Sequence, residues 1–233
     1  MMKPYKYLLL DLDNTLFDFD RAEKAAFFAA FSASGIHADD SVYEKYHVIN
    51  SALWKQLERG EVTKDQLKVL RFSRLFEACG IPSADGGYAM SCLYADLLAG
   101  QRFLLDGAKD VCQVLSTHYK LYGVTNGIGY IQRGRFFGSE LEVYFSDLFI
   151  SEELGAEKPS PIYFSQVIDR VGDEDLSRYC IIGDSLSSDI AGAGNVGIDA
   201  IWLDRAHTGD ARGHAVSYIL NDIRELPDYL LNN

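Results

Sequence analysis

Short apolar runs recur along the 233-residue chain and constrain its fold more than any other feature. They comprise Tyr7–Leu10, Tyr119–Val124, Asp147–Ile150, Cys180–Ile182 and Ala200–Leu203. Continuous apolar runs of this length are typical of strands that are buried on both faces of a parallel sheet. Helical patterns separate the later runs, over Ala108–Thr117, Ile128–Phe137, Ile162–Val171 and Ser187–Asn195. Strands that alternate with helices predict an α/β fold, a doubly wound parallel sheet (Rossmann-like core) with helices on both faces.

The interval between the first two runs is too long for an ordinary crossover connection, because more than 90 residues separate Leu10 from Tyr119. Helical patterns fill this interval over Arg21–Ser34, Ser41–Arg59, Thr63–Ala78 and Gly87–Leu98. Asp39 or Asp40 and Thr63 are candidate N-caps. The sequence therefore predicts an α/β core of residues 1–17 and 100–233 that is interrupted by an inserted α-helical cap of residues 18–99.

Composition limits the classes of partner. The chain has 22 Lys and Arg residues against 34 Asp and Glu residues, a formal net charge of −12. This acidic balance argues against nucleic-acid polymers and anionic membranes as main partners. No apolar run approaches the roughly 18 residues of a membrane span, and the run after Lys6 is too short for a signal peptide. The four scattered cysteines indicate reduced thiols, and we expect a cytoplasmic protein.

Four polar motifs follow the predicted strands. They are DLDNT at 11–15, TNG at 125–127, EKPSP at 157–161 and GDSLSSD at 183–189. In open parallel sheets, ligands bind beyond the carboxyl ends of the strands, where the strand order reverses. These motifs can therefore meet in one crevice although they are far apart in the sequence.

Carboxylates dominate this predicted crevice. Asp11, Asp13, Asp184 and Asp189 would place up to four negative charges together, which is unfavourable unless a cation lies among them. Carboxylates, waters and phosphate oxygens are the ligands that Mg²⁺ prefers. The motifs therefore predict a Mg²⁺ site that in turn holds a phosphate.

The other motif residues offer groups that bind an anion. Lys158 would supply a fixed positive charge. Thr125 and the backbone N–H groups around Asn126 and Gly127, at the start of a predicted helix, would supply hydrogen-bond donors. These donors strengthen the prediction of a phosphate site.

Taken together, the motifs resemble those of the haloacid dehalogenase superfamily of phosphatases. That family has D-x-D-x-T, a Thr or Ser after the second strand, a Lys, and an acidic G-D-x…D motif, and one of its subclasses has a helical cap after the first motif. The flanking stretches VTNG, Q-x-x-R-F (Gln132–Phe136), EKPSPIYF and GDSLSSDIAGA resemble more closely the bacterial pyrimidine 5′-nucleotidases of this superfamily. The resemblance covers the whole chain.

The resemblance implies a role for each carboxylate. Asp11 would be the nucleophile and form an aspartyl-phosphate, and Asp13 would protonate the leaving oxygen and then deprotonate the hydrolytic water. Mg²⁺ would be held by Asp11, the backbone carbonyl of Asp13 and Asp184, with Asp189 positioning it. By the same resemblance, Thr125, Asn126 and Lys158 would bind the phosphate of the substrate.

Several functions fit this resemblance. The expected activity is Mg²⁺-dependent hydrolysis of a small phosphorylated metabolite, a pyrimidine nucleoside 5′-monophosphate. Alternatives on the same scaffold are a sugar-phosphate or phosphoglycolate-type phosphatase and a phosphomutase. A non-enzymatic regulator that keeps its phosphate is a further alternative. The acid Asp13 disfavours this regulator and also disfavours a dehalogenase, because neither needs that proton donor.

The core motifs bind only phosphate and metal, so selection of the substrate must depend on other residues. Phe17 and Phe19 flank the passage from the first motif to the predicted cap and are candidate specificity residues, with hinge packing as the alternative. Phe27, Phe28 and Phe31 lie at helical spacing and indicate a core of the cap instead.

Overall fold

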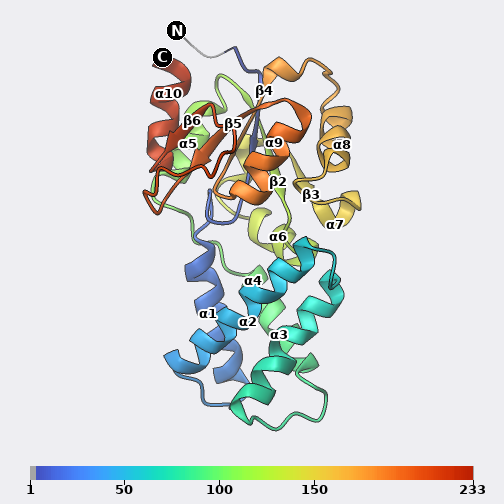
Figure 1. The fold of residues 1–233 in the computed structure, drawn as a ribbon. Helices are drawn as coiled ribbons and strands as arrows, with labels where there is room; N and C mark the ends of the chain where they lie inside the picture. Colours follow the sequence, from blue (N-terminus) through green and yellow to red (C-terminus); the bar gives the residue numbers. More distant parts are fainter. Residues whose placement is uncertain (1–3, 233) are drawn as a thin grey trace. The chain divides into compact units, whose positions relative to one another are not determined.

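The computed structural model describes residues 4–232, which contain a six-stranded parallel sheet (Figure 1). Its strands are β1 (Tyr7–Leu10), β2 (Lys120–Thr125), β3 (Phe145–Ile150), β4 (Tyr179–Gly183), β5 (Asp199–Leu203) and β6 (Tyr218–Leu220). They lie in the order β3-β2-β1-β4-β5-β6, and every neighbouring pair is parallel. The strand order reverses beside β1, with β2 on one side and β4 on the other. The predicted doubly wound sheet is confirmed.

Helices cover both faces of this sheet (Figure 1). They are α5 (Ala108–Leu115), α6 (Gly129–Phe136), α7 (Ser151–Leu154), α8 (Pro161–Val171), α9 (Ala191–Val196) and α10 (Leu226–Asn232). Short 3-10 helices over Glu142–Tyr144, Leu176–Arg178 and Ile223–Glu225 precede β3, β4 and α10.

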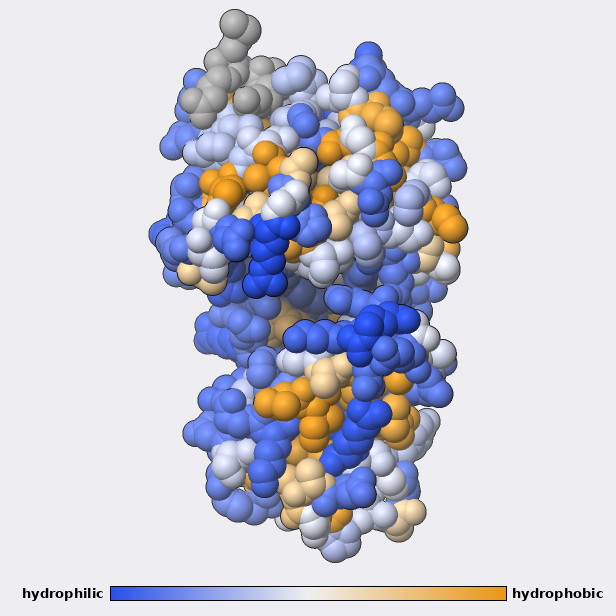
Figure 2. Space-filling view, viewed as in Figure 1, coloured by the Kyte–Doolittle hydropathy of each residue, from blue (hydrophilic) through white to orange (hydrophobic). Residues whose placement is uncertain are grey.

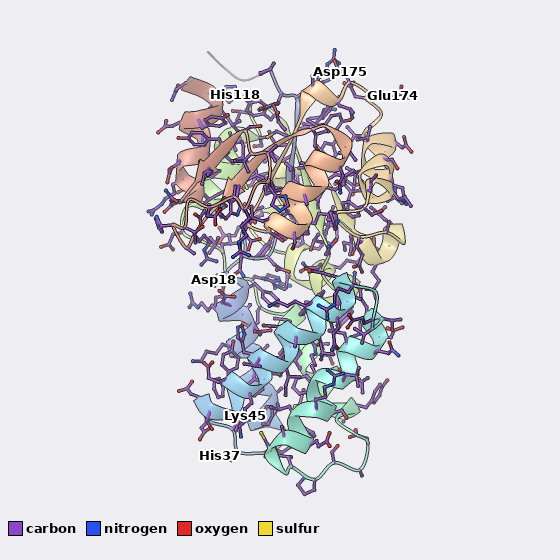
Figure 3. All side chains as sticks on the ribbon, in the orientation of Figure 1. Asp18, His37, Lys45, His118, Glu174 and Asp175 are labelled. Atoms are coloured by element: carbon purple, nitrogen blue, oxygen red, sulfur yellow. The ribbon has the colours of Figure 1, made fainter. Side chains whose placement is uncertain are left out.

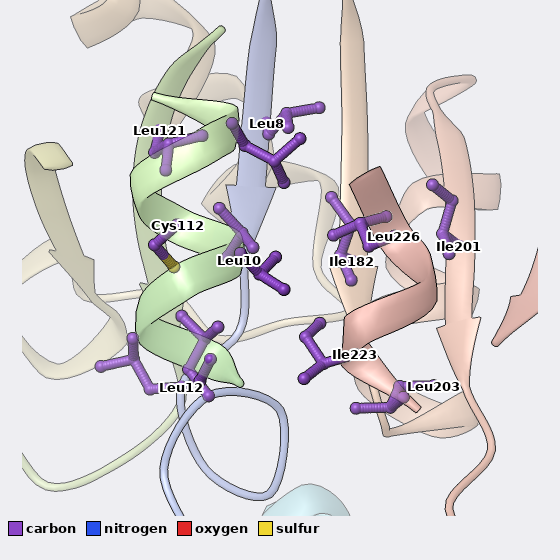
Figure 4. Close-up of a cluster of buried hydrophobic side chains, with 14 of the residues drawn as sticks. Leu8, Leu10, Leu12, Cys112, Leu121, Ile182, Ile201, Leu203, Ile223 and Leu226 are labelled. Atoms are coloured by element: carbon purple, nitrogen blue, oxygen red, sulfur yellow. The ribbon is translucent and has the colours of Figure 1, made fainter. Parts of the chain in front are cut away.

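The two faces of β1 belong to two separate hydrophobic clusters. Leu8 and Leu10 pack on one face with residues of α5 and α10 (Figure 4). Tyr7 and Leu9 pack on the other face with residues of α8 and α9. All three leucines are fully buried, and burial of one such side chain contributes about 1.5–3 kcal/mol. Burial on both faces explains why the sequence of β1 shows no polar and apolar alternation.

Three elements of the sheet and its covering helices differ from the expectation from sequence. The predicted helix Ser187–Asn195 begins instead as a five-residue π-helix over Leu186–Ile190, because the N–H groups of Asp189 and Ile190 both donate to the carbonyl of Ser185. The sequence analysis also did not predict β6 or α10, since a three-residue strand and a seven-residue helix carry little periodicity.

The four helices predicted for the inserted segment are present. They are α1 (Phe19–Ala33), α2 (Asp40–Glu58), α3 (Lys64–Cys79) and α4 (Tyr88–Ala99). Asp39 caps α2 by accepting the N–H of Val42, and Thr63 forms a capping box with Gln66 at the start of α3. Phe27 and Phe31 are fully buried among other aromatic rings of these helices, so their prediction as core residues is confirmed. Phe28, which was predicted with them, is half-buried.

Residue contacts divide the chain into two compact units. The sheet unit runs to Phe19 and resumes at Arg102, and the helical unit comprises Asp20–Gln101. Hydrophilic residues cover much of the face drawn in Figure 2, with smaller apolar patches between them. Among the described residues, no helix is long and apolar enough to span a membrane. That the helical unit serves as a cap stays a prediction.

Candidate active site

The motif residues lie at the edge of the sheet where the parallel strands end. Figure 3 shows Asp18 beyond the end of β1, whereas His118, Glu174 and Asp175 lie at the opposite edge, before β2 and β4 begin. The DLDNT motif follows β1, whereas GDSLSSD and TNG begin with the last residues of β4 and β2. The EKPSP motif does not directly follow a strand as expected, because α7 (Ser151–Leu154) lies between it and β3.

Asp11 is held at the end of β1 by the backbone of the neighbouring strand. Its N–H donates to the carbonyl of Ile182 in β4 at 2.9 Å, so the residue stays in line with the sheet. The chain then turns sharply, since the N–H groups of Leu16 and Phe17 both donate to the carbonyl of Leu12. This turn brings the hydroxyl of Thr15 to 3.2 Å from Oδ2 of Asp11. Asp11 is 7% exposed.

Lys158 joins two of the carboxylates. Its Nζ lies 2.6 Å from Oδ1 of Asp11 and 2.6 Å from Oδ1 of Asp189, and it also donates to the carbonyl of Val124. Burial opposes the charge of this lysine, but Asp11 and Asp189 outweigh that effect and raise the pKa of Lys158 above its ordinary value. The ammonium group therefore remains charged among the acids.

Asp11, Asp184 and Asp189 form a cluster of carboxylates. One oxygen of each lies within 4.8 Å of the others. Burial raises the pKa of Asp184 to about 7, and the charge of Asp189 adds to this effect. Burial also raises the pKa of Asp11 well above its ordinary value, with Lys158 opposing the shift and Asp189 adding to it. Lys158 opposes the shifts of both acids but does not cancel them.

The donor set of this cluster fits a small divalent cation. Mg²⁺ prefers oxygen ligands, and all three side chains of this cluster are carboxylates that lie close to one another. The cluster contains no histidine or cysteine. Gly183 lies so close to Asp189 that a Cβ at this position would come 2.2 Å from Oδ2, and only glycine leaves room for this carboxylate.

Asp13 lies beside the cluster, with both carboxylate oxygens engaged. Oδ2 accepts from Nε2 of Gln132 at 2.8 Å, and Oδ1 accepts from a guanidinium N–H of Arg135. Both residues belong to α6 and are buried. Sequence reasoning placed both in a family-like motif without assigning them a role. Their spacing of three residues, on a predicted helix directly after TNG, was the available signal.

The TNG loop has two functions in its local structure. Both the N–H of Gly127 and Nε2 of Gln132 donate to Oγ1 of Thr125, so the hydroxyl proton of Thr125 is left to donate elsewhere. The side chain of Asn126 binds both the N–H and the carbonyl of Lys158, which fixes the loop that carries this lysine. The N–H of Gly127 was expected to bind an anion, but it is engaged within the loop.

The two candidate specificity residues lie against an arginine. The guanidinium carbon of Arg135 lies 5.0 Å from the ring centroid of Phe17 and 5.3 Å from that of Phe19. Phe17 is fully buried in the hydrophobic cluster of the sheet unit, whereas Phe19 is half-buried. This burial favours the packing alternative for Phe17, and a role in specificity stays a prediction for both residues.

Comparison with known proteins gives the same family as the motifs. Residues 5–197 match the model of the haloacid dehalogenase-like hydrolases. The chain is 38% identical to the pyrimidine 5′-nucleotidase PynA of Streptococcus pneumoniae, over 98% of this chain and 96% of that one. It is 29% identical to the pyrimidine 5′-nucleotidase YjjG of Escherichia coli, over 97% and 98% of the two chains.

A solved structure supports the same relationship. The HAD-hydrolase YfnB of Bacillus subtilis, in a magnesium-bound crystal form that reveals interdomain movement, superposes with a TM-score of 0.90. The two sequences are 33% identical, and the match covers 97% of this chain and 99% of that one. The parallel sheet, the convergent acidic motifs and these likenesses agree, and the chain belongs to the haloacid dehalogenase-like hydrolases.

Proposed function

We propose that this hydrolase removes phosphate from pyrimidine nucleoside 5′-monophosphates through an aspartyl-phosphate at Asp11. The observation that carries the proposal is the ion-paired group of Asp11, Lys158 and Asp189, with Asp13 two residues beyond the first acid. A buried carboxylate beside a fixed cation can act as a nucleophile, and a second carboxylate close to it can move protons.

The first step forms a bond between a carboxylate oxygen of Asp11 and phosphorus. The bond from phosphorus to the ester oxygen of the substrate breaks, and that oxygen takes a proton from the carboxyl group of Asp13 as it leaves. Lys158, which lies 2.6 Å from Asp11, offsets negative charge on the transferring group. The hydroxyl of Thr125 donates to a phosphate oxygen.

The second step returns the enzyme to its starting state. A water molecule attacks the phosphorus of the aspartyl-phosphate and gives a proton to Asp13. The bond between phosphorus and the carboxylate of Asp11 breaks, so inorganic phosphate is released. The two proton transfers by Asp13 are opposite in direction, and the protons balance over the cycle.

The cluster fits Mg²⁺, which Asp11, Asp184 and the backbone carbonyl of Asp13 would hold, with Asp189 supporting the site. When bound, the cation neutralises charge on the phosphate and removes the repulsion among the acids. The magnesium in the crystal structure of YfnB supports this assignment.

Two named relatives support the substrate class. PynA and YjjG are both pyrimidine 5′-nucleotidases, and both match nearly the whole of this chain. The match includes residues 20–101, the part of the chain outside the sheet unit. Since the core motifs bind only phosphate and metal, likeness in this second part is the relevant support for a shared substrate.

A phosphate-release screen tests the proposal. Purified protein with Mg²⁺ is assayed against pyrimidine and purine nucleoside 5′-monophosphates, sugar phosphates and phosphoglycolate, with Asp11→Asn as the control for contaminating phosphatases. We expect the highest kcat/KM for the pyrimidine nucleotides and no turnover by the variant. A higher kcat/KM for a sugar phosphate or phosphoglycolate would overturn the substrate class, and turnover by the variant at a rate comparable to wild type would overturn the mechanism.

A further inference from the structure

Two residues of α6 hold the carboxylate of Asp13 from both sides. Nε2 of Gln132 donates to Oδ2 at 2.8 Å, and Arg135 donates to Oδ1. A guanidinium N–H of Arg135 also lies 3.3 Å from Oε1 of Gln132, so the two α6 side chains contact each other. Because each carboxylate oxygen has its own donor, the plane of the carboxylate is fixed as well as its position.

This arrangement is deeply buried. Gln132 and Arg135 are each 1% exposed, whereas the side chain of Asp13 is 27% exposed. Taking a guanidinium out of water is costly unless it is paired with a carboxylate and satisfied by hydrogen bonds. A fully buried arginine and a fully buried glutamine both donate to Asp13, which is itself partly exposed, and a surface ion pair does not require this arrangement.

Neighbouring residues restrict the two α6 side chains. Nε2 of Gln132 also donates to Oγ1 of Thr125 at 2.7 Å. A Cβ at Gly127 would lie 2.3 Å from that same nitrogen, so the loop leaves room for this amide only because residue 127 is glycine. On the other side, the guanidinium of Arg135 lies against the rings of Phe17 and Phe19. A cation beside the face of an aromatic ring is attracted to it.

We propose that Gln132 and Arg135 are positioning residues that orient the carboxylate of Asp13 for proton transfer to the leaving oxygen. The inference rests on the proposed role of Asp13 but not on the identity of the nucleotide. A carboxylate has about four lone-pair sites, and the two hydrogen bonds occupy only two of them. A site therefore remains on Asp13 for the proton that it transfers, with its direction set by α6.

Phe17 and Phe19 gain a role from the same geometry. Their rings pack on Arg135, and Arg135 binds Asp13, so the stretch after the first motif supports the acid through the arginine. Support of this kind would affect turnover of every substrate, whereas the predicted specificity role would affect only the choice among substrates.

The test compares leaving groups that need a proton to different extents. The kcat/KM values of wild type, Arg135→Met, Arg135→Lys, Gln132→Met and Asp13→Asn are measured for phenyl phosphate and p-nitrophenyl phosphate. Nitrophenolate departs readily without a proton, whereas phenolate is a poorer leaving group and depends more on the acid. The value of kcat/KM reports steps up to the aspartyl-phosphate, so the later hydrolysis does not enter the comparison.

Arg133→Met is the matched control. Arg133 lies on the same helix and also pairs with a carboxylate, Glu153, but it is exposed and does not contact Asp13. We expect this variant to keep both kcat/KM values within about twofold of wild type, since exposed ion pairs contribute little.

A positioning role predicts unequal losses. General acid catalysis contributes about 10²–10⁴-fold, so Asp13→Asn should lose that much on phenyl phosphate and clearly less on p-nitrophenyl phosphate. Arg135→Met and Gln132→Met should each lose about tenfold or more on phenyl phosphate and less on the nitrophenyl ester. Arg135→Lys, which retains a charged donor, should recover part of that loss. If Arg135→Met does not fold, Gln132→Met and Arg135→Lys carry the same comparison.

Two results would overturn the inference in distinguishable ways. Equal losses on both esters for the α6 variants, with unequal losses for Asp13→Asn, would show that Gln132 and Arg135 serve only the fold. Equal losses for Asp13→Asn itself would overturn the proposed role of Asp13 and the inference with it.

Discussion

At the scale of single residues, the site holds buried acids whose charges repel one another, although Lys158 pairs with two of them. Asp184 shows this most clearly, because burial and the nearby charge of Asp189 raise its pKa to about 7. An unfolded chain would expose the same group to water and return its pKa to the ordinary value of 3.8. The folded metal-free protein therefore holds a proton on this group that the unfolded chain releases.

This difference makes stability depend on pH in a predictable direction. Between about pH 4 and pH 7 the folded state binds more protons at Asp184 than the unfolded state, so the free energy of unfolding falls as pH rises. The stabilising contribution of protonated Asp184 is complete below pH 4 and is lost as pH rises through about 7. We expect Asp184→Asn to flatten this fall in the free energy of unfolding. Urea denaturation in chelator across this range measures it, and equal slopes for wild type and variant would contradict the prediction.

The residue scale also shows what the sequence could indicate. Asp11, Asp13, Asp184 and Asp189 were predicted from motifs because chemistry demands those residue types at strand ends. The hydrogen bonds from Gln132 and Arg135 to Asp13 were not predicted, because a glutamine and an arginine three residues apart are equally compatible with a solvated helix face. Only the burial of these side chains of α6 against the first motif distinguishes a site role from a solvated face.

At the scale of elements, the helical unit contains a buried acid that is unrelated to the sheet site. Glu23 of α1 is 2% exposed and accepts from Nδ2 of Asn50 at 2.7 Å. It also lies 3.2 Å from Nδ1 of His47 and 3.4 Å from the hydroxyl of Tyr43, both on α2. This acid therefore links α1 to α2 inside the helical unit.

Removal of Glu23 should destabilise the helical unit. In Glu23→Ala, the buried amide of Asn50 loses its acceptor, and a buried polar group left unsatisfied costs about 1–3 kcal/mol. We expect the free energy of unfolding to fall by at least this amount in chemical denaturation followed by far-UV circular dichroism. Glu44→Ala, at an exposed position on α2, should change it by less than about 0.5 kcal/mol. Equal effects of the two substitutions would contradict the prediction.

The elements differ in how well their sequences predict them. The four helices of the helical unit were predicted to within about two residues, because each contains 12–19 residues with a helical periodicity, and Asp39 and Thr63 mark the starts of α2 and α3. β6 and α10 lack that periodicity. The π-helix over Leu186–Ile190 depends on two N–H groups sharing the carbonyl of Ser185, which no hydrophobic pattern can indicate.

At the scale of the whole molecule, one fold combines a buried parallel sheet with an acidic edge. The chain carries a net charge of −12, and two buried cationic side chains, Lys158 and Arg135, pair with acids at this edge. The proposed Mg²⁺ would add to their positive charge. The alternation of strands and helices was sufficient to predict the sheet. The helical segment predicted over residues 18–99 differs by two residues at each end from the helical unit, Asp20–Gln101.

Metal removal tests the cation requirement of the whole enzyme. We expect chelation to abolish turnover and added Mg²⁺ to restore it. Ca²⁺ should bind but support little turnover, because its larger and more flexible coordination shell permits both oxygens of Asp11 to bind and so spoils the angle of attack. Phosphate release in chelator, Mg²⁺ and Ca²⁺ measures this, and full activity in excess chelator would contradict the assigned metal site.

The most direct test of the account is the detection of the covalent intermediate. The enzyme is mixed with a ³²P-labelled pyrimidine nucleoside 5′-monophosphate and Mg²⁺, quenched in acid within milliseconds, digested, and its labelled peptides are sequenced by mass spectrometry. The account predicts a phosphoryl group on Asp11, labile to alkali as acyl phosphates are, and its absence from Asp11→Asn. Label on another residue, or turnover with no labelled protein at any quench time, would contradict the account.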